Sequence, residues 1–237
     1  MHQRGEPHAA AARSSQPIVP FARSRKGSAV YETLKRLIVL GQLREGEPLL
    51  EIQLATQFGC SQGPVREALM RLQEDGLVLR EGYRGTMVST TTEAEAREML
   101  ALRVRLELQG LRRAVPRLTA TDIAGLAKQV EAMEELARAG DDYGMVEADR
   151  DFHLTIFRAA GLPALEPILL RCFLHVHRAS WAKPGRRRTL MEAARSHWPI
   201  VEALRGPDAD GGAAALRDHI LTVVEDMPPL TAEEVDW

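Results

Sequence analysis

Residues 50–78 read LEIQLATQFGCSQGPVREALMRLQEDGLV, and this stretch decides the fold of the front of the chain. Apolar residues recur at helical spacing in two short runs, which predicts two helices that meet at Gly59. Ser61 is a good first residue for the second helix, and Pro64 is tolerated in its first turn. The apolar positions are Leu50, Leu54 and Phe58 in the first helix, then Val65, Ala68, Leu69 and Leu72 in the second. Two short helices joined by a tight turn are typical of a helix-turn-helix.

The residues on either side of this pair predict a third helix and a β-hairpin. The helix precedes the pair, begins near Ser28 and stops at Gly41. Two extended runs, Leu77–Arg80 and Thr86–Ser89, follow the pair and are separated by a turn that contains glycine. Three helices followed by a hairpin describe a winged helix-turn-helix domain.

In such a domain the second helix of the pair fits the major groove of DNA, and its N-terminal residues reach the base edges. The expected base-contacting residues are Ser61, Gln62, Gly63 and Arg66. The tip of the hairpin is expected to lie along a phosphate backbone or to enter the minor groove, through Tyr83, Arg84 and Gly85. The helical pattern alone leaves a second interpretation open, because many small domains of this shape bind no nucleic acid.

From Thr92 onward every segment has the helical period, so the rear of the chain is expected to be an all-α antiparallel bundle. Short connections rich in Gly, Pro or Asp favour antiparallel neighbours. The predicted helices cover residues 93–115, 121–139, 142–160, 164–181, 187–205 and 212–226. The fold class is therefore mainly α.

The chain divides into three segments with different properties. Residues 1–26 are rich in Ala, show no periodicity and are predicted to form a disordered tail, ahead of a winged domain at 27–90 and a helical domain at 91–230. Residues 1–90 carry 12 Lys and Arg against 9 Asp and Glu, a net charge of +3. Residues 91–237 carry 19 against 24, a net charge of −5. The basic front is compatible with a polyanionic partner.

Four side chains of the rear segment form a candidate metal site. They are Asp149, His153, His197 and His219. Asp149 and His153 are four residues apart on one predicted helix, so they project from one face. One carboxylate and three imidazoles suit a first-row divalent ion such as Zn, Ni, Mn or Fe. Alternatively each histidine is hydrogen-bonded separately, since spacing does not show that three helices converge. His175 and His177 are two residues apart, so at most one faces a common pocket, and neither is included.

The block Pro64-Val65-Arg66-Glu67-Ala68-Leu69 and the preceding Leu54-Ala55-x-x-Phe58-Gly59 resemble the GntR superfamily of bacterial transcription regulators. The resemblance implies DNA binding by the winged domain. Members of the superfamily usually carry Arg after the first Ser of the recognition helix, whereas this chain carries Gln62. Arg pairs bidentately with guanine and Gln with adenine, so we expect DNA binding with an altered or relaxed operator preference.

The rear segment resembles the FCD ligand-binding domain of the FadR-like subgroup. The similar residues include Asp149-x-x-Phe152-His153-x-x-Ile156 and His197-x-x-Ile200. In metal-binding members the ligands fall at the positions of Asp149, His153, His197 and His219, so the resemblance implies a metal site here. It also implies a small carboxylate effector, such as a sugar acid, a hydroxy acid or a relative of an amino acid.

Arg103 matches a family position on the first rear helix, where a guanidinium group is suited to pair with an effector carboxylate. The alternative for a single Arg on a helix is a solvated salt bridge, here with Glu107. Two departures from the family pattern bear on the metal site. Pro199 is expected to kink the helix that bears His197, and residues 206–212 form a longer connection than the family has.

With 237 residues, two cysteines and no long apolar run, the chain is expected to be a cytoplasmic protein without a membrane span or a disulfide framework. The sequence predicts a transcription repressor that binds an inverted repeat of double-stranded DNA as a homodimer and is not an enzyme. Two alternatives stay open: a metal-dependent hydrolase with an appended DNA-binding domain, and a DNA-binding protein whose bundle only dimerises.

Overall fold

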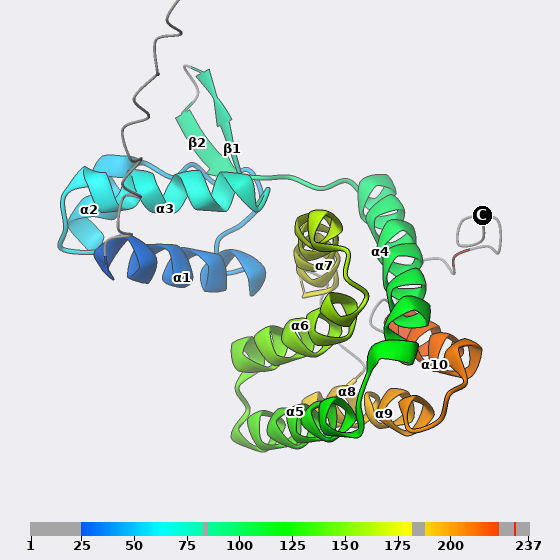
Figure 1. Ribbon diagram of the computed structural model, residues 1–237. Coiled ribbons are helices and arrows are strands. Elements are labelled where there is room, and N and C mark those ends of the chain that lie inside the picture. Colours follow the sequence, from blue (N-terminus) through cyan, green and yellow to red (C-terminus); the bar gives the residue numbers. More distant parts are fainter. Residues whose placement is uncertain (1–24, 83–84, 182–187, 223–229, 231–237) are drawn as a thin grey trace, which may run out of the picture.

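Three helices and a two-stranded hairpin form the front domain (Figure 1). The computed structural model describes residues 25–82, 85–181, 188–222 and 230. The elements of the front domain are α1 (Arg25–Val39), α2 (Glu51–Gln57), α3 (Gln62–Glu74), β1 (Val78–Glu81) and β2 (Gly85–Val88). The predicted winged helix-turn-helix fold is confirmed. Helix α1 begins at Arg25 and not near Ser28, so residues 25 and 26 are helical, and the remainder of the expected tail lies outside the described residues.

The core of the front domain lies between α1, α3 and the hairpin. Val30, Leu34 and Ile38 of α1 are buried at helical spacing against Val65 and Leu72 of α3. The antiparallel strands pair Val78 with Val88, and both of these side chains are buried. The expectation that Leu50 lies on the apolar face of the first short helix is wrong. Helix α2 begins one residue later, which leaves Leu50 49% exposed and buries Leu49 instead.

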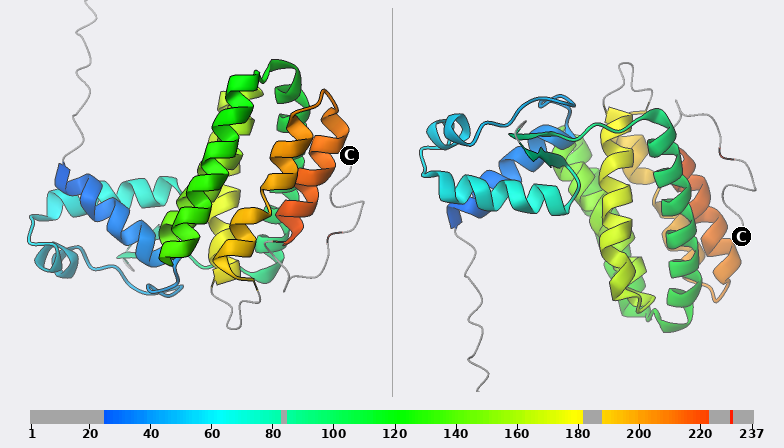
Figure 2. Two further views of the ribbon diagram at one scale, coloured as in Figure 1. Left: turned by 90° about the horizontal axis from the view of Figure 1, so that it is seen from below. Right: turned by 90° about the horizontal axis from the view of Figure 1, so that it is seen from above.

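The rear domain is the predicted antiparallel bundle (Figure 2). Thr92, Thr119 and Thr189 each begin a helix with a capping box, in which the hydroxyl accepts a backbone N–H and an acidic side chain accepts from the threonine. The helices are α4 (Glu93–Ala114), α5 (Ala120–Ala139), α6 (Asp142–Ala159), α7 (Glu166–Trp181), α8 (Leu190–Arg195), α9 (Trp198–Leu204) and α10 (Ala209–Thr222). The short 3-10 turn η2 (Val115–Arg117) directly follows α4, and a second one, η3 (Pro163–Leu165), directly precedes α7.

The structure changes two boundaries near the candidate metal site. The helix expected over residues 187–205 is two helices, α8 and α9, with His197 between them. Pro199 lies in the first turn of α9, where its missing N–H costs nothing, so the expected kink is a complete break. Helix α10 begins at Ala209, because the Asp208 carboxylate accepts the N–H groups of Asp210 and Gly211. The connection after α9 is therefore short.

The two domains share one apolar core. Val146 of α6 and Phe173 and Leu174 of α7 are buried together with residues of α1, α3 and the hairpin. An ion pair joins the domains at the same place, where Lys35 Nζ of α1 lies 3.0 Å from Glu147 Oε1 of α6. Helices α6 and α7 thus belong to the rear bundle and also support the front domain.

Helices α4 and α6 approach closely at Gly110. A Cβ atom at this glycine would lie 2.5 Å from Cδ2 of the buried Phe157 ring. Gly125 of α5 is the contrasting case, because it is exposed and a Cβ atom there would meet no atom within 4 Å.

We predict opposite effects of the same substitution at these two glycines. Gly110→Ala forces the Phe157 ring to move and lowers the free energy of unfolding by about 1–3 kcal/mol. Gly125→Ala raises it by about 0.5–1 kcal/mol, because alanine restricts the unfolded chain and fills no occupied space. Urea unfolding followed by circular dichroism measures both. Equal effects at the two sites would show that α4 and α6 are not packed this closely.

Candidate metal centre and nucleic-acid interface

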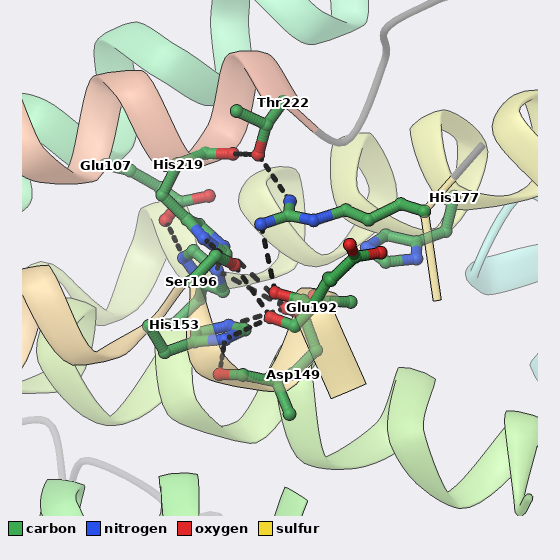
Figure 3. A network of polar contacts seen from close by, with 12 residues as sticks. Glu107, Asp149, His153, His177, Glu192, Ser196, His219 and Thr222 are labelled. Carbon is green, nitrogen blue, oxygen red and sulfur yellow. Dashed lines mark hydrogen bonds and ion pairs between the residues drawn. The ribbon is translucent and has the colours of Figure 1, made fainter. Parts of the chain in front are cut away.

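Four buried side chains from three parts of the rear domain meet at one point (Figure 3). Asp149 and His153 lie one turn apart on α6, His197 lies at the break between α8 and α9, and His219 lies on α10. One potential ligand atom of each residue lies within 4.8 Å of the others. The structure therefore brings together the whole predicted ligand set, and neither Pro199 nor the connection before α10 separates it.

The three histidines turn the same ring atom toward the carboxylate. His197 Nε2 lies 2.7 Å from Asp149 Oδ1, and the Nε2 atoms of His153 and His219 each lie 3.8 Å from it. The Nε2 atoms of His153 and His219 are 3.1 Å apart. All four potential ligand atoms thus surround one small volume.

The other ring nitrogen of each histidine has a separate partner. His197 Nδ1 lies 3.1 Å and 3.0 Å from the carbonyl oxygens of Ala193 and Ala194, which only accept, so this nitrogen carries the proton. The hydroxyl of Ser196 donates to the Ala193 carbonyl at 2.7 Å, so it accepts from His219 Nδ1 at 2.9 Å. His153 Nδ1 donates to the Glu107 carboxylate.

These contacts fix the tautomers of the three rings. In the neutral form each ring carries its proton on Nδ1, so three Nε2 lone pairs point at each other and at a carboxylate oxygen. Lone pairs at such distances repel each other unless a proton or a metal ion lies among them. A metal-ligating histidine characteristically donates its other N–H to a carboxylate, a carbonyl or a hydroxyl, as all three do here. The donor set therefore fits a divalent cation.

The ionisation of the cluster agrees with this assignment. Burial by itself raises the pKa of Asp149, but hydrogen bonds from His177 and His197, and the positive charge that His153 and His197 carry when they are protonated, hold it well below its usual value. Burial lowers the pKa of His219 well below its ordinary value, and the nearby His197 and His153 lower it further. The carboxylate is therefore ionised and the His219 ring neutral, which are the forms that bind metal.

Arg103 lies deep in the bundle beside the cluster and not in solvent. Its side chain is fully buried, with Nε 2.6 Å from Glu107 Oε1 and the guanidinium 4.5 Å from the ring centre of Phe173. The salt bridge to Glu107 is therefore present, but the expectation that it is solvated is wrong. Within the described part of the chain, Nη1 and Nη2 of Arg103 have no hydrogen-bond partner. A buried guanidinium with two unused donors is a ready partner for an anion.

Two residues beside the cluster were not among the predicted site residues. His177 of α7 places Nε2 3.1 Å from Asp149 Oδ2 and stacks on Phe173, with ring centres 4.2 Å apart. Glu107 holds both His153 and Arg103. The spacing of two between His175 and His177 correctly indicates that only one of them faces the cluster. The interval of four between Phe173 and His177 was the available signal for choosing His177, because it places both on one helix face.

The expected DNA-contacting residues lie at the start of α3 and on the hairpin. Ser61 is the N-cap residue of α3, Gln62 and Gly63 form its first turn, and Arg66 follows one turn later with 58% of its side chain exposed. Gly85 begins β2 with φ of 80°, a conformation that favours glycine. Tyr83 and Arg84 lie outside the described residues.

Arg66 is held by two neighbours. Its Nε lies 2.5 Å from Glu51 Oε2, and its Nη2 donates to Gln62 Oε1 at 3.0 Å. The second oxygen of Glu51 accepts from Arg80 of β1 at 3.1 Å. One carboxylate thereby links the second helix of the pair to the hairpin and orients Arg66 on the exposed face of α3.

Comparison with known proteins assigns both domains to families. Residues 26–88 match the family described as "Bacterial regulatory proteins, gntR family", and residues 98–222 match the "FCD domain". None of the helices in the described residues is long and apolar enough to cross a membrane.

Similar proteins carry names of transcription regulators. A "Probable D-xylose utilization operon transcriptional repressor" of Paenarthrobacter nicotinovorans is 33% identical over 208 residues, which cover 84% of this chain and 88% of that protein. The "HTH-type transcriptional repressor RspR" of Escherichia coli K12 is 25% identical over 208 residues, which cover 88% of this chain and 91% of that protein. The solved structure of E. coli McbR/YncC has a TM-score of 0.72 at 23% identity, over 86% of this chain and 97% of that one, and it shares the fold.

Proposed function

Because the chain belongs to the GntR family of bacterial regulatory proteins and carries an FCD domain, we propose that it is a transcriptional repressor controlled by a metal-bound organic acid. The family and the names of its relatives identify a DNA-binding transcription regulator and not an enzyme, so a metal-dependent hydrolase is not supported. In the proposed function, the rear domain binds the acid and thereby changes the affinity of the front domain for its operator.

The observation that carries the proposal is the convergence of three Nε2 lone pairs on one oxygen of Asp149. Asp149, His153, His197 and His219 would hold a divalent ion, and Zn, Ni, Mn and Fe all accept imidazole and carboxylate ligands. When bound, the metal supplies a Lewis-acid centre at which a carboxylate ligand binds. Glu107 and Ser196 keep the Nδ1 protons of two rings in place, and so keep their Nε2 atoms directed at the site.

Arg103 supports an acid as the effector. Its two unpaired Nη atoms present the fork geometry that pairs with a carboxylate, and its burial excludes water from competing. Glu107 accepts hydrogen bonds from both Arg103 and His153, so it connects the Arg103 guanidinium to the cluster. A compact acid that reaches both the metal and Arg103 would therefore satisfy the unpaired donors.

The front domain supports binding to double-stranded DNA through α3. Ser61, Gln62, Gly63 and Arg66 occupy the end of α3 that enters the major groove in a helix-turn-helix. A homodimer would present two such helices to the two halves of an inverted repeat, whose half-sites lie about one helical turn apart.

We predict that the cluster determines metal binding. Chain purified without a His-tag and equilibrated with zinc retains about one ion per molecule. Asp149→Asn and His219→Ala each weaken zinc affinity by about 100-fold or more, measured by calorimetry and by elemental analysis after dialysis. The control is Asp151→Asn, which changes an exposed carboxylate on the same helix. Unchanged zinc binding by both cluster variants would instead support a bundle that only dimerises.

We predict that Arg103 determines the response to acids. In a thermal-shift screen of sugar acids and hydroxy acids on zinc-loaded protein, an acid at 100 times its Kd stabilises the fold by about 2.7 kcal/mol. Arg103→Lys keeps the charge but loses the fork, so most of this stabilisation disappears while zinc binding persists. The exposed Arg112→Lys on the same helix serves as the control. An equal shift in Arg103→Lys would exclude Arg103 from the acid site.

We predict that Gln62 sets one base preference in each half-site. Selection of bound duplexes from a random pool, carried out for the wild type and for Gln62→Arg, measures this preference. The variant selects guanine at one symmetric position, because a bidentate Arg–guanine pair discriminates by about 1–3 kcal/mol. Identical selected motifs would mean that Gln62 does not contact a base.

A further inference from the structure

Helix α7 lies between the DNA-binding domain and α4 (Figures 1 and 2). Its residues from Phe173 to Arg178 are spread over about 7.5 Å of helix axis. Within this short stretch, some side chains contact the buried cluster. Others contact the DNA-binding domain and the linker, which is the segment of residues 89–92 between β2 and α4.

Two side chains of α7 face the cluster. His177 contacts Asp149 Oδ2 at 3.1 Å, and its ring stacks on Phe173. The Phe173 ring also lies under the guanidinium of Arg103. Any rearrangement of Asp149 or Arg103 on ligand binding therefore acts directly on α7.

The buried Arg178 holds the linker to α7. With 3% of its side chain exposed, it donates from Nη1 to Ser89 Oγ at 2.9 Å and from Nη2 to Thr91 Oγ1 at 2.6 Å. Its Nη2 also lies 3.0 Å from Glu45 Oε1 in the turn between α1 and α2. One side chain thus contacts both the turn between α1 and α2 and the segment that follows the hairpin.

Thr91 has a second contact with the same helix. Its Oγ1 lies 2.8 Å from His175 Nδ1. Burial and the nearby guanidinium groups of Arg178 and Arg171 lower the pKa of His175 to about 4, so the ring is neutral. Because Arg178 can only donate, the Thr91 hydroxyl accepts from Arg178 Nη2, and it forms its second hydrogen bond with His175 Nδ1. Both hydrogen bonds of the Thr91 hydroxyl are therefore formed with side chains of α7.

The same helix packs against the turn that follows α3. Gly76 has φ of 79°, and a Cβ atom there would lie 2.4 Å from Arg171 Nε of α7. Phe173 and Leu174 are buried in the core of the DNA-binding domain. Helix α7 therefore contacts the end of the DNA-reading helix, the core of that domain and its linker.

We propose that α7 couples the occupancy of the metal cluster to the position of the DNA-binding domain, with Thr91, His175 and Arg178 as positioning residues. The inference rests on the proposed function, since it requires the cluster to bind a cation. Coupling of this kind requires that the cluster binds its ligand with different affinity in the two arrangements of the domains. A helix with buried contacts at both of its faces moves as one body, so a change at His177 is transmitted to Thr91 and Ser89.

Hydrogen exchange of the full chain tests the proposal with zinc as the ligand. Amide exchange of residues 86–92 is measured by mass spectrometry with zinc and after removal of zinc by a chelator. The variant Thr91→Val keeps the shape of the side chain and removes both hydrogen bonds to α7. Thr155→Val is the matched control, because among the described residues the Thr155 hydroxyl hydrogen-bonds to Gln129 and to a backbone carbonyl of its own helix. Arg178→Lys is a second variant that keeps the buried positive charge.

In the wild type and in Thr155→Val, zinc slows exchange of residues 86–92 by about fivefold. Thr91→Val and Arg178→Lys bind zinc with unchanged affinity and lose most of this difference. A merely structural role would instead change exchange equally with and without zinc. The proposal is overturned if Thr91→Val keeps the zinc-dependent difference, or if the wild type binds zinc without any change in residues 86–92. Absence of zinc binding by the wild type is a separate result, because it removes the proposed metal site and the coupling with it.

Discussion

The rear domain depends on the burial of one carboxylate among three imidazoles. Asp149 is 5% exposed, and an isolated buried charge is very costly, so it needs a partner of opposite charge. Each surrounding ring is held by a hydrogen bond at Nδ1, which prevents it from turning its N–H toward the carboxylate without breaking that bond. A cation at the centre resolves this conflict for all four groups together. The same cation would join α6, the break between α8 and α9, and α10 at one point. Helix α4 contributes Glu107, which accepts a hydrogen bond from His153 and holds its ring in place.

This arrangement gives the proposed binding event in the rear domain a direct route to the DNA-binding domain. Helix α6 carries Asp149 and His153 of the cluster, α7 carries His177 that contacts Asp149, and both helices also carry residues of the shared apolar core. Val146 lies one turn before Asp149, and Phe173 contacts both Arg103 and the DNA-binding domain. The domains are therefore not independent modules on a flexible tether. At the other end, Glu51 connects Arg66 to the hairpin, so the DNA-reading surface is also held as a unit.

Much of the fold could be predicted from the sequence, because its signals are local. Glycines at the turns, serines at helix starts and apolar residues at helical spacing indicate the three front helices, the hairpin and most rear helices. The four side chains could be nominated from their residue types and spacing, but their convergence could be expected only from the resemblance, because it depends on contacts between residues far apart in the sequence. Contacts between helices account for what was missed. Glu107 is recognisable only once α4 is known to lie beside His153, whereas the interval of four between Phe173 and His177 could have selected His177 from the sequence. The break at His197 could not be distinguished from a kink, because Pro199 permits both.

X-ray absorption at the zinc edge of the loaded chain, purified without a His-tag, tests the central claim most directly. The account predicts a shell of nitrogen and oxygen atoms at about 2.0–2.1 Å, with the outer scattering of three imidazole rings. Sulfur at about 2.3 Å, or scattering from fewer than three rings, would contradict it, because Asp149 and the three histidines would then not share one ion.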